Sequence, residues 1–143
     1  MLFESFIHHN FVFAGQFSDT FNFNIGSLST VTATALNISF DVAANSLGNI
    51  SFFAASLDGA PLALSTTTTP ILPGFAVVTQ KLLLSDVPRL AGSHTLTIGG
   101  VGDSFINGYI GSIAVTAVPE PETYALMLAG LGAIGLLMKR RST

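Results

Sequence analysis

The stretch Gln16–Ile25 constrains the fold most, because its side chains alternate between large apolar and small polar residues. The apolar positions are Phe17, Phe21, Phe23 and Ile25, and the polar positions between them are Ser18, Thr20, Asn22 and Asn24. Successive side chains of a β-strand point to opposite faces of the sheet. The period of two therefore predicts a half-buried strand whose aromatic face lies on a core.

Asp19 is the exception in this strand, because it falls on the aromatic face between Phe17 and Phe21. A buried carboxylate without a partner is costly, so Asp19 needs hydrogen-bond donors or a position at the rim of the sheet. Two interpretations are open. Either the carboxylate binds a ligand or a metal ion, or it accepts backbone N–H groups and holds a loop in place.

The rest of the body has the pattern of further short strands separated by turns. We expect strands over 29–42, 50–57, 60–65, 75–84, 94–98 and 108–118. A tight turn is expected at Asp58-Gly59, and the apolar phase of 29–42 changes at Ala35-Leu36, which predicts a β-bulge or a change of sheet. The glycines of 99–102 lack the Gly-Lys-Ser/Thr of a phosphate loop and are interpreted as a turn or bulge. Together these patterns predict an all-β fold, an antiparallel β-sandwich or jelly-roll-like body over residues 15–118.

Residues 1–14 make a poor export signal. They contain no Lys or Arg, and Glu4, His8, His9 and Asn10 interrupt any apolar run. We therefore expect an atypical N-terminal segment here, with the signal peptide absent or truncated.

Charge and cysteine content exclude several functional classes. Charged residues make up only 9% of the chain, and the body before residue 119 carries six acids against two bases. An acidic body without a basic patch argues against nucleic-acid binding. The chain has no cysteine, which excludes disulfides and thiolate metal sites.

The C-terminal segment 119–143 has three parts in a fixed order. Pro119-Glu120-Pro121 is an extended spacer, because proline fixes φ and lacks the N–H group that a strand or helix interior needs. Residues 124–138 carry no charge and are apolar on all sides, and Lys139, Arg140 and Arg141 form a basic end. A helix over 124–138 would rise about 22 Å, somewhat short of a bilayer core of about 30 Å. With snorkelling at its ends we expect it to form a single transmembrane helix with its basic end in the cytoplasm.

The ordered set of Pro119-Glu120-Pro121, apolar span and basic end resembles the PEP-CTERM sorting signal of Gram-negative bacteria. The resemblance implies recognition by exosortase, a membrane-embedded, cysteine-protease-like sorting enzyme, followed by release or transfer to the cell surface. Phe17-x-Asp19-x-Phe21, the segment 91–98 and the last strand before Pro119 also resemble the FxDxF subgroup of that family. That subgroup consists of small β-rich proteins of unknown biochemical activity.

No residue set in the sequence predicts catalysis or a cofactor. His8 and His9 are far from His94, no His-x-x-x-His spacing exists, and no Gly-x-Ser-x-Gly nucleophile elbow occurs. We therefore expect no catalytic residues, no metal site and no cofactor. The leading hypothesis is a non-enzymatic surface or extracellular-matrix protein that an exosortase sorts and processes. The alternatives are an exopolysaccharide-binding module and a self-associating matrix protein.

Overall fold

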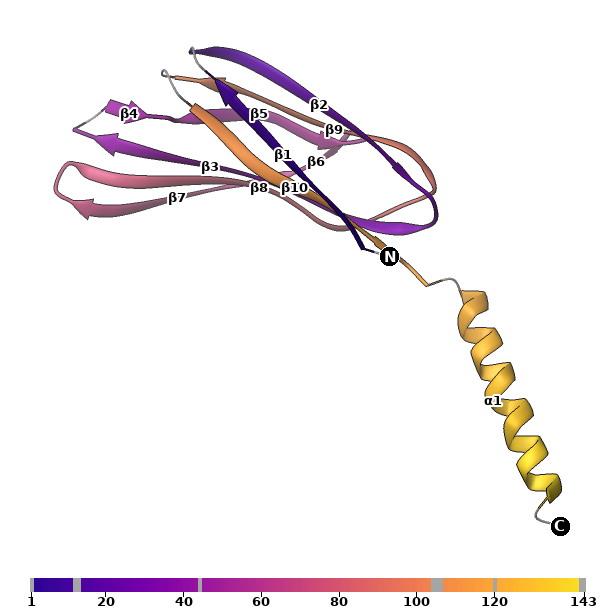
Figure 1. Cartoon of the computed structure of the whole chain (residues 1–143). Coiled ribbons are helices and arrows are strands. Elements are labelled where there is room, and N and C mark those ends of the chain that lie inside the picture. Colours follow the sequence, from indigo (N-terminus) through magenta and orange to yellow (C-terminus); the bar gives the residue numbers. More distant parts are fainter. Residues whose placement is uncertain (1, 12–13, 44, 104–106, 120, 142–143) are drawn as a thin grey trace.

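The computed structural model describes residues 2–11, 14–43, 45–103, 107–119 and 121–141. Two antiparallel sheets form the body, and one helix follows it (Figure 1). The large sheet has the order β1 (Leu2–Phe11), β10 (Asn107–Ala117), β3 (Ser29–Val42), β8 (Phe75–Arg89) and β7 (Ala63–Leu72), and β4 (Asn45–Leu47) pairs with β3. The small sheet has the order β2 (Gly15–Ile25), β9 (Gly92–Gly102), β5 (Ile50–Leu57) and β6 (Ala60–Pro61). The helix is α1 (Pro121–Arg141).

The strands pair in a nested order. β1 pairs with β10, β2 with β9, β3 with β8, and β5 with β6. The first and third of these strand pairs lie in the large sheet, and the second and fourth lie in the small sheet. This alternation of nested antiparallel pairs between two sheets is the arrangement of a jelly roll. The prediction of an all-β antiparallel fold is confirmed.

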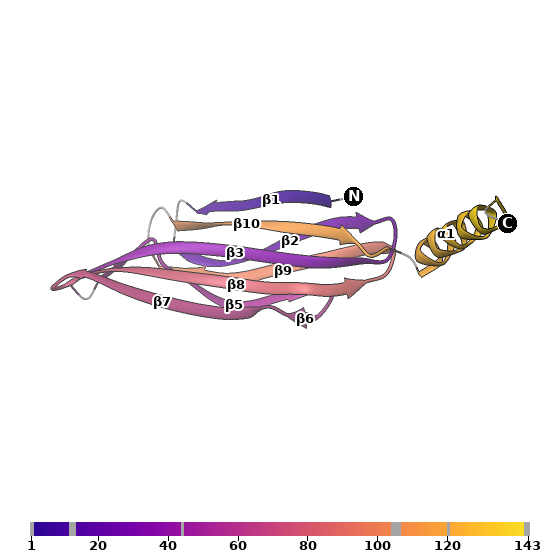
Figure 2. The same ribbon diagram turned by 90° about the horizontal axis from the view of Figure 1, so that it is seen from below.

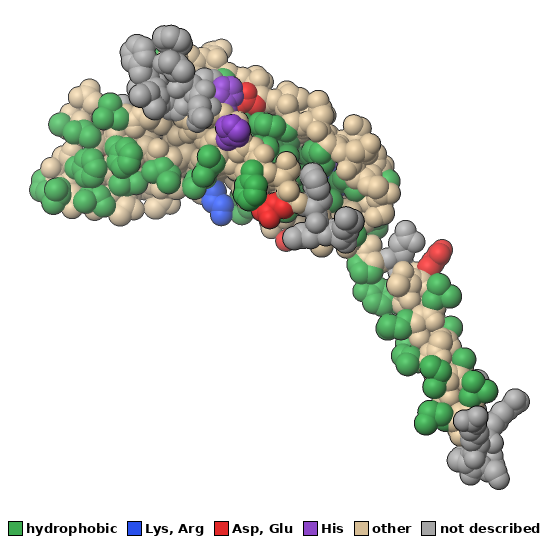
Figure 3. Space-filling view, in the orientation of Figure 1, with side chains coloured by type: hydrophobic (Ala, Val, Ile, Leu, Met, Phe, Trp, Pro, Cys, Tyr) green, Lys and Arg blue, Asp and Glu red, His purple; other side chains and the backbone are tan. Residues whose placement is uncertain are grey.

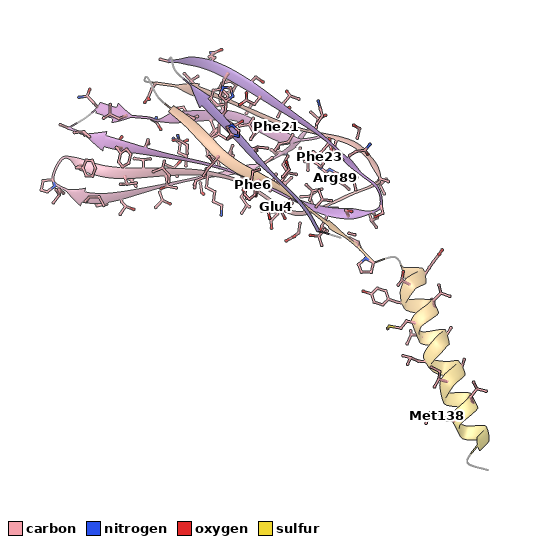
Figure 4. The ribbon with its side chains drawn as sticks, viewed as in Figure 1. Glu4, Phe6, Phe21, Phe23, Arg89 and Met138 are labelled. Atoms are coloured by element: carbon pink, nitrogen blue, oxygen red, sulfur yellow. The ribbon has the colours of Figure 1, made fainter. Side chains whose placement is uncertain are left out.

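The core lies between the two sheets, whose strands overlap in the view of Figure 2. Its buried side chains come from both sheets and are Ile7, Phe17, Ile25, Val31, Ala33, Ala35, Ile50, Phe52, Leu57, Leu62, Leu82, Leu96, Ile98, Tyr109, Ile113 and Val115. Phe21 and Phe23 are partly buried and pack against this cluster (Figure 4). The predicted aromatic face of residues 16–25 therefore points into the core.

β1 brings the N-terminal residues into the large sheet. The sequence set residues 1–14 apart from the sandwich, yet Leu2–Phe11 pairs with β10 along its whole length. Ile7 is buried in the core, while Phe6 on the opposite face is 80% exposed. Buried and exposed side chains therefore alternate here as in other strands. The sequence does not show this alternation clearly, because His8 and His9 are two adjacent polar residues.

The predicted phase change in β3 is wrong. β3 pairs with β8 continuously from Ala33 to Val42, and the irregularity of this ladder lies between Val31 and Ala33. The buried phase continues past Ala35 through two polar residues, Asn37 and Ser39. The apolar residues of the other phase face solvent, and they include Ile38, Phe40 and Val42.

Asn37 can be buried because its amide group has three partners. Its Nδ2 donates to the carbonyl oxygens of Gly48, at 3.0 Å, and Gly108, at 2.7 Å, and its Oδ1 accepts the Ile50 N–H at 3.3 Å. A buried polar group satisfied in this way carries little penalty. The side chain thereby ties β3 to the loop before β5 and to the start of β10.

The glycines of 99–102 lie inside β9 rather than in a turn. The bulge is on the neighbouring strand, where the β5–β9 register shifts between Phe52 and Ala54. The ring of Phe53 approaches to 3.2 Å of the position that a Cβ on Gly99 would occupy. Small residues in β9 therefore make room for side chains of its neighbours.

α1 begins at Pro121, the last residue of the Pro119-Glu120-Pro121 spacer. Pro121 suits the first helical position, where no N–H bond is required, and Glu122 in the first turn complements the positive end of the helix dipole. The sequence predicted a transmembrane helix over 124–138. Among the described residues, however, no helix has the length and apolar character needed to cross a membrane. The apolar span 124–138 is only 15 residues long, whereas a bilayer core requires about 20.

Candidate functional site

The C-terminal segment leaves the body at the end of β10. The last backbone hydrogen bond before the spacer runs from the Val118 N–H to the Leu28 carbonyl oxygen, at 3.0 Å. Pro119 follows and is exposed, and α1 then projects away from the sandwich, with Met138 near its far end (Figures 1 and 4). The segment after Val118 is therefore accessible to another protein.

The described apolar side chains of α1 are exposed on all sides. Those of large size are Tyr124, Leu126, Met127, Leu128, Leu131, Ile134, Leu137 and Met138. Leu126 is 74% exposed and Met138 is 69% exposed. Contiguous apolar surface of this kind marks a segment that interacts with a partner, because leaving it in water is unfavourable. The helix is thus not part of the domain core.

Residues 117–141 match the model of the PEP-CTERM protein-sorting motif. Signals of this kind mark proteins of Gram-negative bacteria that are exported to the cell surface. No curated protein and no solved structure matches the chain. The match supports an exported protein that an exosortase sorts, and it covers the segment whose exposure is described above.

The residues predicted for sorting are placed as follows. Pro119 lies exposed between β10 and α1, and Pro121 is the first residue of the helix. Glu120 lies outside the described residues. Lys139, Arg140 and Arg141 form the last turn of α1, but their side chains also lie outside the described part.

Asp19 lies at a junction between the two sheets. Its Oδ2 accepts a hydrogen bond from the Tyr109 hydroxyl at 2.6 Å, and both carboxylate oxygens lie 2.6 Å from Nδ1 of His9. Asp19 belongs to β2 of the small sheet, whereas His9 and Tyr109 belong to β1 and β10 of the large sheet. These partners of Asp19 are side chains of the other sheet rather than the backbone N–H groups of a loop.

Aromatic rings enclose this junction. The Phe17 ring stacks on Tyr109 with centroids 5.9 Å apart, His9 lies 5.8 Å from Phe17, and Phe52 meets Tyr109 edge-on at 5.8 Å. Tyr109 is 2% exposed. Burial first, and then the hydrogen bond and charge of Asp19, raise the pKa of Tyr109 well above its ordinary value. The hydroxyl therefore stays protonated and donates.

Two residues of the Phe17-x-Asp19-x-Phe21 motif meet in this junction. Phe17 and Asp19 both contact the Tyr109 side chain, whereas Phe21 packs against the core cluster. Gly100 lies opposite Phe17 in the β2–β9 ladder, and a Cβ there would be 2.8 Å from the Phe17 ring. The motif thus has a structural part, which fixes the Phe17 ring between Tyr109 and a glycine.

A second cluster surrounds Asp58 in the predicted tight turn, where φ is 50° at Asp58 and 83° at Gly59. Asp58 accepts hydrogen bonds from Arg89 Nε at 3.0 Å, His94 Nδ1 at 2.8 Å and the Thr95 N–H at 2.9 Å. Burial alone would raise the pKa of Asp58, but these bonds outweigh it and lower the pKa below its ordinary value. The cluster fastens the β5–β6 turn to β8 and β9.

The surroundings of His94 oppose a catalytic role. A serine protease-like triad needs the second imidazole nitrogen to face a serine hydroxyl. Here Nε2 of His94 instead lies 2.9 Å from the Leu90 carbonyl oxygen. Among the described residues, no group of three or more His, Cys, Asp or Glu side chains could hold a metal ion.

Sequence reasoning missed His9, Tyr109, Asn37 and the Asp58 cluster. The signal for Tyr109 was its phase, since Tyr109, Ile113 and Val115 alternate in the last strand. No comparable signal exists for His9 or Asn37, because their partners come from segments far away in the chain.

Proposed function

We propose that this protein is a non-enzymatic component of the cell surface or extracellular matrix, delivered through its C-terminal segment by an exosortase. The observation that carries the proposal is the sorting-motif match over residues 117–141, on a segment that is exposed and follows the last strand directly. In this proposal the sandwich is the delivered cargo. The Phe17-x-Asp19-x-Phe21 motif serves its stability, and assignment to the FxDxF subgroup stays a prediction.

The sorting step is tested with the intact mass of the protein. The chain, with an export signal supplied upstream, is expressed in a host with and without the exosortase, and membrane and extracellular fractions are compared. Loss of a C-terminal fragment beginning near Val118 to Tyr124, only with the enzyme, is the expected result. An identical full-length product in both hosts would refute the proposal.

A double variant links processing to the motif. Replacing Pro119 and Glu120 with Ala is expected to abolish the enzyme-dependent mass change. Pro73→Ala with Glu4→Ala is the matched control, because it removes the same residue types from the body. Processing of the motif variant at the wild-type level would contradict this role of the spacer.

The exopolysaccharide-binding alternative is favoured by one observation. A cavity of about 410 Å³ lies at the end of the large sheet, lined by Asp41, Ala43, Asn45, Pro70, Leu72, Gly74, Phe75 and Ala76. Its volume lies in the range of small-molecule sites. Carboxylate and amide groups can bind sugar hydroxyls, and the Phe75 ring offers an apolar surface.

Calorimetric titration with purified exopolysaccharide of the host tests this alternative. Asp41→Ala is expected to weaken binding at least about tenfold, which corresponds to loss of a charge-assisted hydrogen bond. Asp103→Ala, an exposed acid outside the cavity lining, serves as the control. No heat of binding, or equal binding by both variants, excludes this cavity as a sugar site.

A further inference from the structure

We propose that two copies of this protein pair antiparallel through β7, so that their large sheets join into one continuous sheet. β7 forms the end of the large sheet and pairs with β8 along one side (Figures 1 and 2). Within the described part of the chain, no strand pairs with its other side. Every residue of this 10-residue strand is exposed.

The composition of β7 lacks the usual protection of a sheet edge. Natural edge strands are short or carry charges, because an open row of N–H and C=O groups templates pairing with another chain. The sequence of β7 is ALSTTTTPIL, which contains no charge and four consecutive threonines. Threonine favours extended strands.

The other edges of the two sheets are better protected. β1 carries Glu4, His8 and His9, and β6 is only two residues long. β2 has 11 residues, but it carries the charged residue Asp19. β7 is thus the long, uncharged edge of this fold.

A second copy of β7 suits this edge for three reasons. Only another strand offers N–H and C=O groups at the spacing of an open ladder. Two-fold antiparallel pairing then sets the Thr66–Thr69 run of one copy against that of the other, which allows favourable Thr–Thr pairs across the strands. The same patch on both copies makes the contact closed, so it yields a dimer rather than an open fibre.

The charges nearest to the edge do not oppose this dimer. Lys81 lies on β8 opposite Ser65. In a pair centred on Thr67, the two Lys81 Cα atoms would lie about 20 Å apart, from strand spacings of about 4.8 Å and rises of about 3.4 Å per residue. That separation is about two and a half times the Debye length of about 8 Å at physiological ionic strength, so the repulsion is screened.

The end of β7 limits how far the pairing runs. Pro70 has no N–H group to donate, and the β7–β8 register shifts between Pro70 and Leu72. In the pair centred on Thr67 we therefore place the shared ladder over residues 65–69. Exposed apolar side chains gather over the adjoining outer face of the large sheet, where Ile38, Phe40 and Leu47 lie (Figure 3).

Cross-linking of the full-length chain tests the proposal independently of sorting. Because the chain has no cysteine, a single Cys placed in turn at Ser65, Thr66, Thr67, Thr68 and Thr69 is the only thiol present. Directly opposed residues have Cβ atoms about 4.5–5.5 Å apart, within reach of a disulfide after small adjustment. Mild oxidation is expected to give covalent dimers whose yield peaks at one or two adjacent positions.

The matched control is Thr116→Cys, an exposed threonine on β10, which is an interior strand of the same sheet. Thr67→Lys, which charges the edge without touching the core, is expected to shift the sedimentation of the full-length protein from dimer to monomer. A wild-type protein that sediments as a monomer overturns the proposal. So does equal cross-linking at residues 65–69 and 116, or a dimer that survives Thr67→Lys, since either places the contact on another surface such as α1.

Discussion

Replacing Tyr109 with Phe is expected to destabilise the body by about 1.5–2 kcal/mol. The change removes one oxygen, whose hydrogen bond to the Asp19 carboxylate measures 2.6 Å, and leaves the ring stacked on Phe17. A hydrogen bond to a charged group contributes about 1.5–3 kcal/mol. We expect the lower part of that range, because the Asp19 carboxylate keeps its hydrogen bond from His9 in the variant.

The measurement is the free energy of unfolding from urea titrations followed by far-UV circular dichroism. Tyr124→Phe is the control, since Tyr124 is half-exposed on α1 and should change the free energy by less than about 0.5 kcal/mol. A double-mutant cycle with Asp19→Ala is expected to give a coupling of about 1 kcal/mol or more. Additive effects of the two substitutions, or a Tyr109→Phe variant as stable as the control, would refute the reasoning that this bond joins the two sheets.

Two further predictions concern the same body. Gly100→Ala is expected to lower the free energy of unfolding by about 1–3 kcal/mol, because the new Cβ would lie 2.8 Å from the Phe17 ring, which its neighbours hold in place. The control is Gly26→Ala, which has open space around it and should leave the stability nearly unchanged. Equal stability of the two variants in urea would contradict the packing argument. The lowered pKa of Asp58 means that its ionised form favours the folded state, so its contribution is present above the ordinary carboxyl range and is lost as pH falls through the lower folded-state value. The stability difference between wild type and Asp58→Asn should therefore shrink on acidification below about pH 4, and a difference that stays constant between neutral and acidic pH would exclude this contribution.

The alternation of Phe17, Phe21 and Phe23 was sufficient to predict both the strand and its buried face. The period of two comes from the backbone geometry of a single strand, so it can be read without knowing the partners. The same pattern failed in β3. There Ile38 and Phe40 look like core residues, whereas Asn37 is buried because Gly48, Gly108 and Ile50 satisfy its amide.

The residues around Asp19 show the corresponding limit for a site. The sequence placed a carboxylate on an aromatic face and required partners for it, and this requirement is met. Its partners could not be named, because His9 lies 10 residues away and Tyr109 lies 90 residues away in the chain. They meet Asp19 only because β1 and β10 pack across the core from β2.

The sequence by itself determined the β class, the end of the body at Pro119 and the ordered sorting segment after it. Each of these depends on local chemistry: the two-residue repeat of a strand, the missing N–H of proline, and an uncharged run followed by basic residues. Only the tertiary structure decided which polar residues are buried, which side chains join the sheets and that β7 forms an open edge. Those properties depend on which distant strands pair, and the pairing energy is shared among contacts that no short stretch of sequence contains.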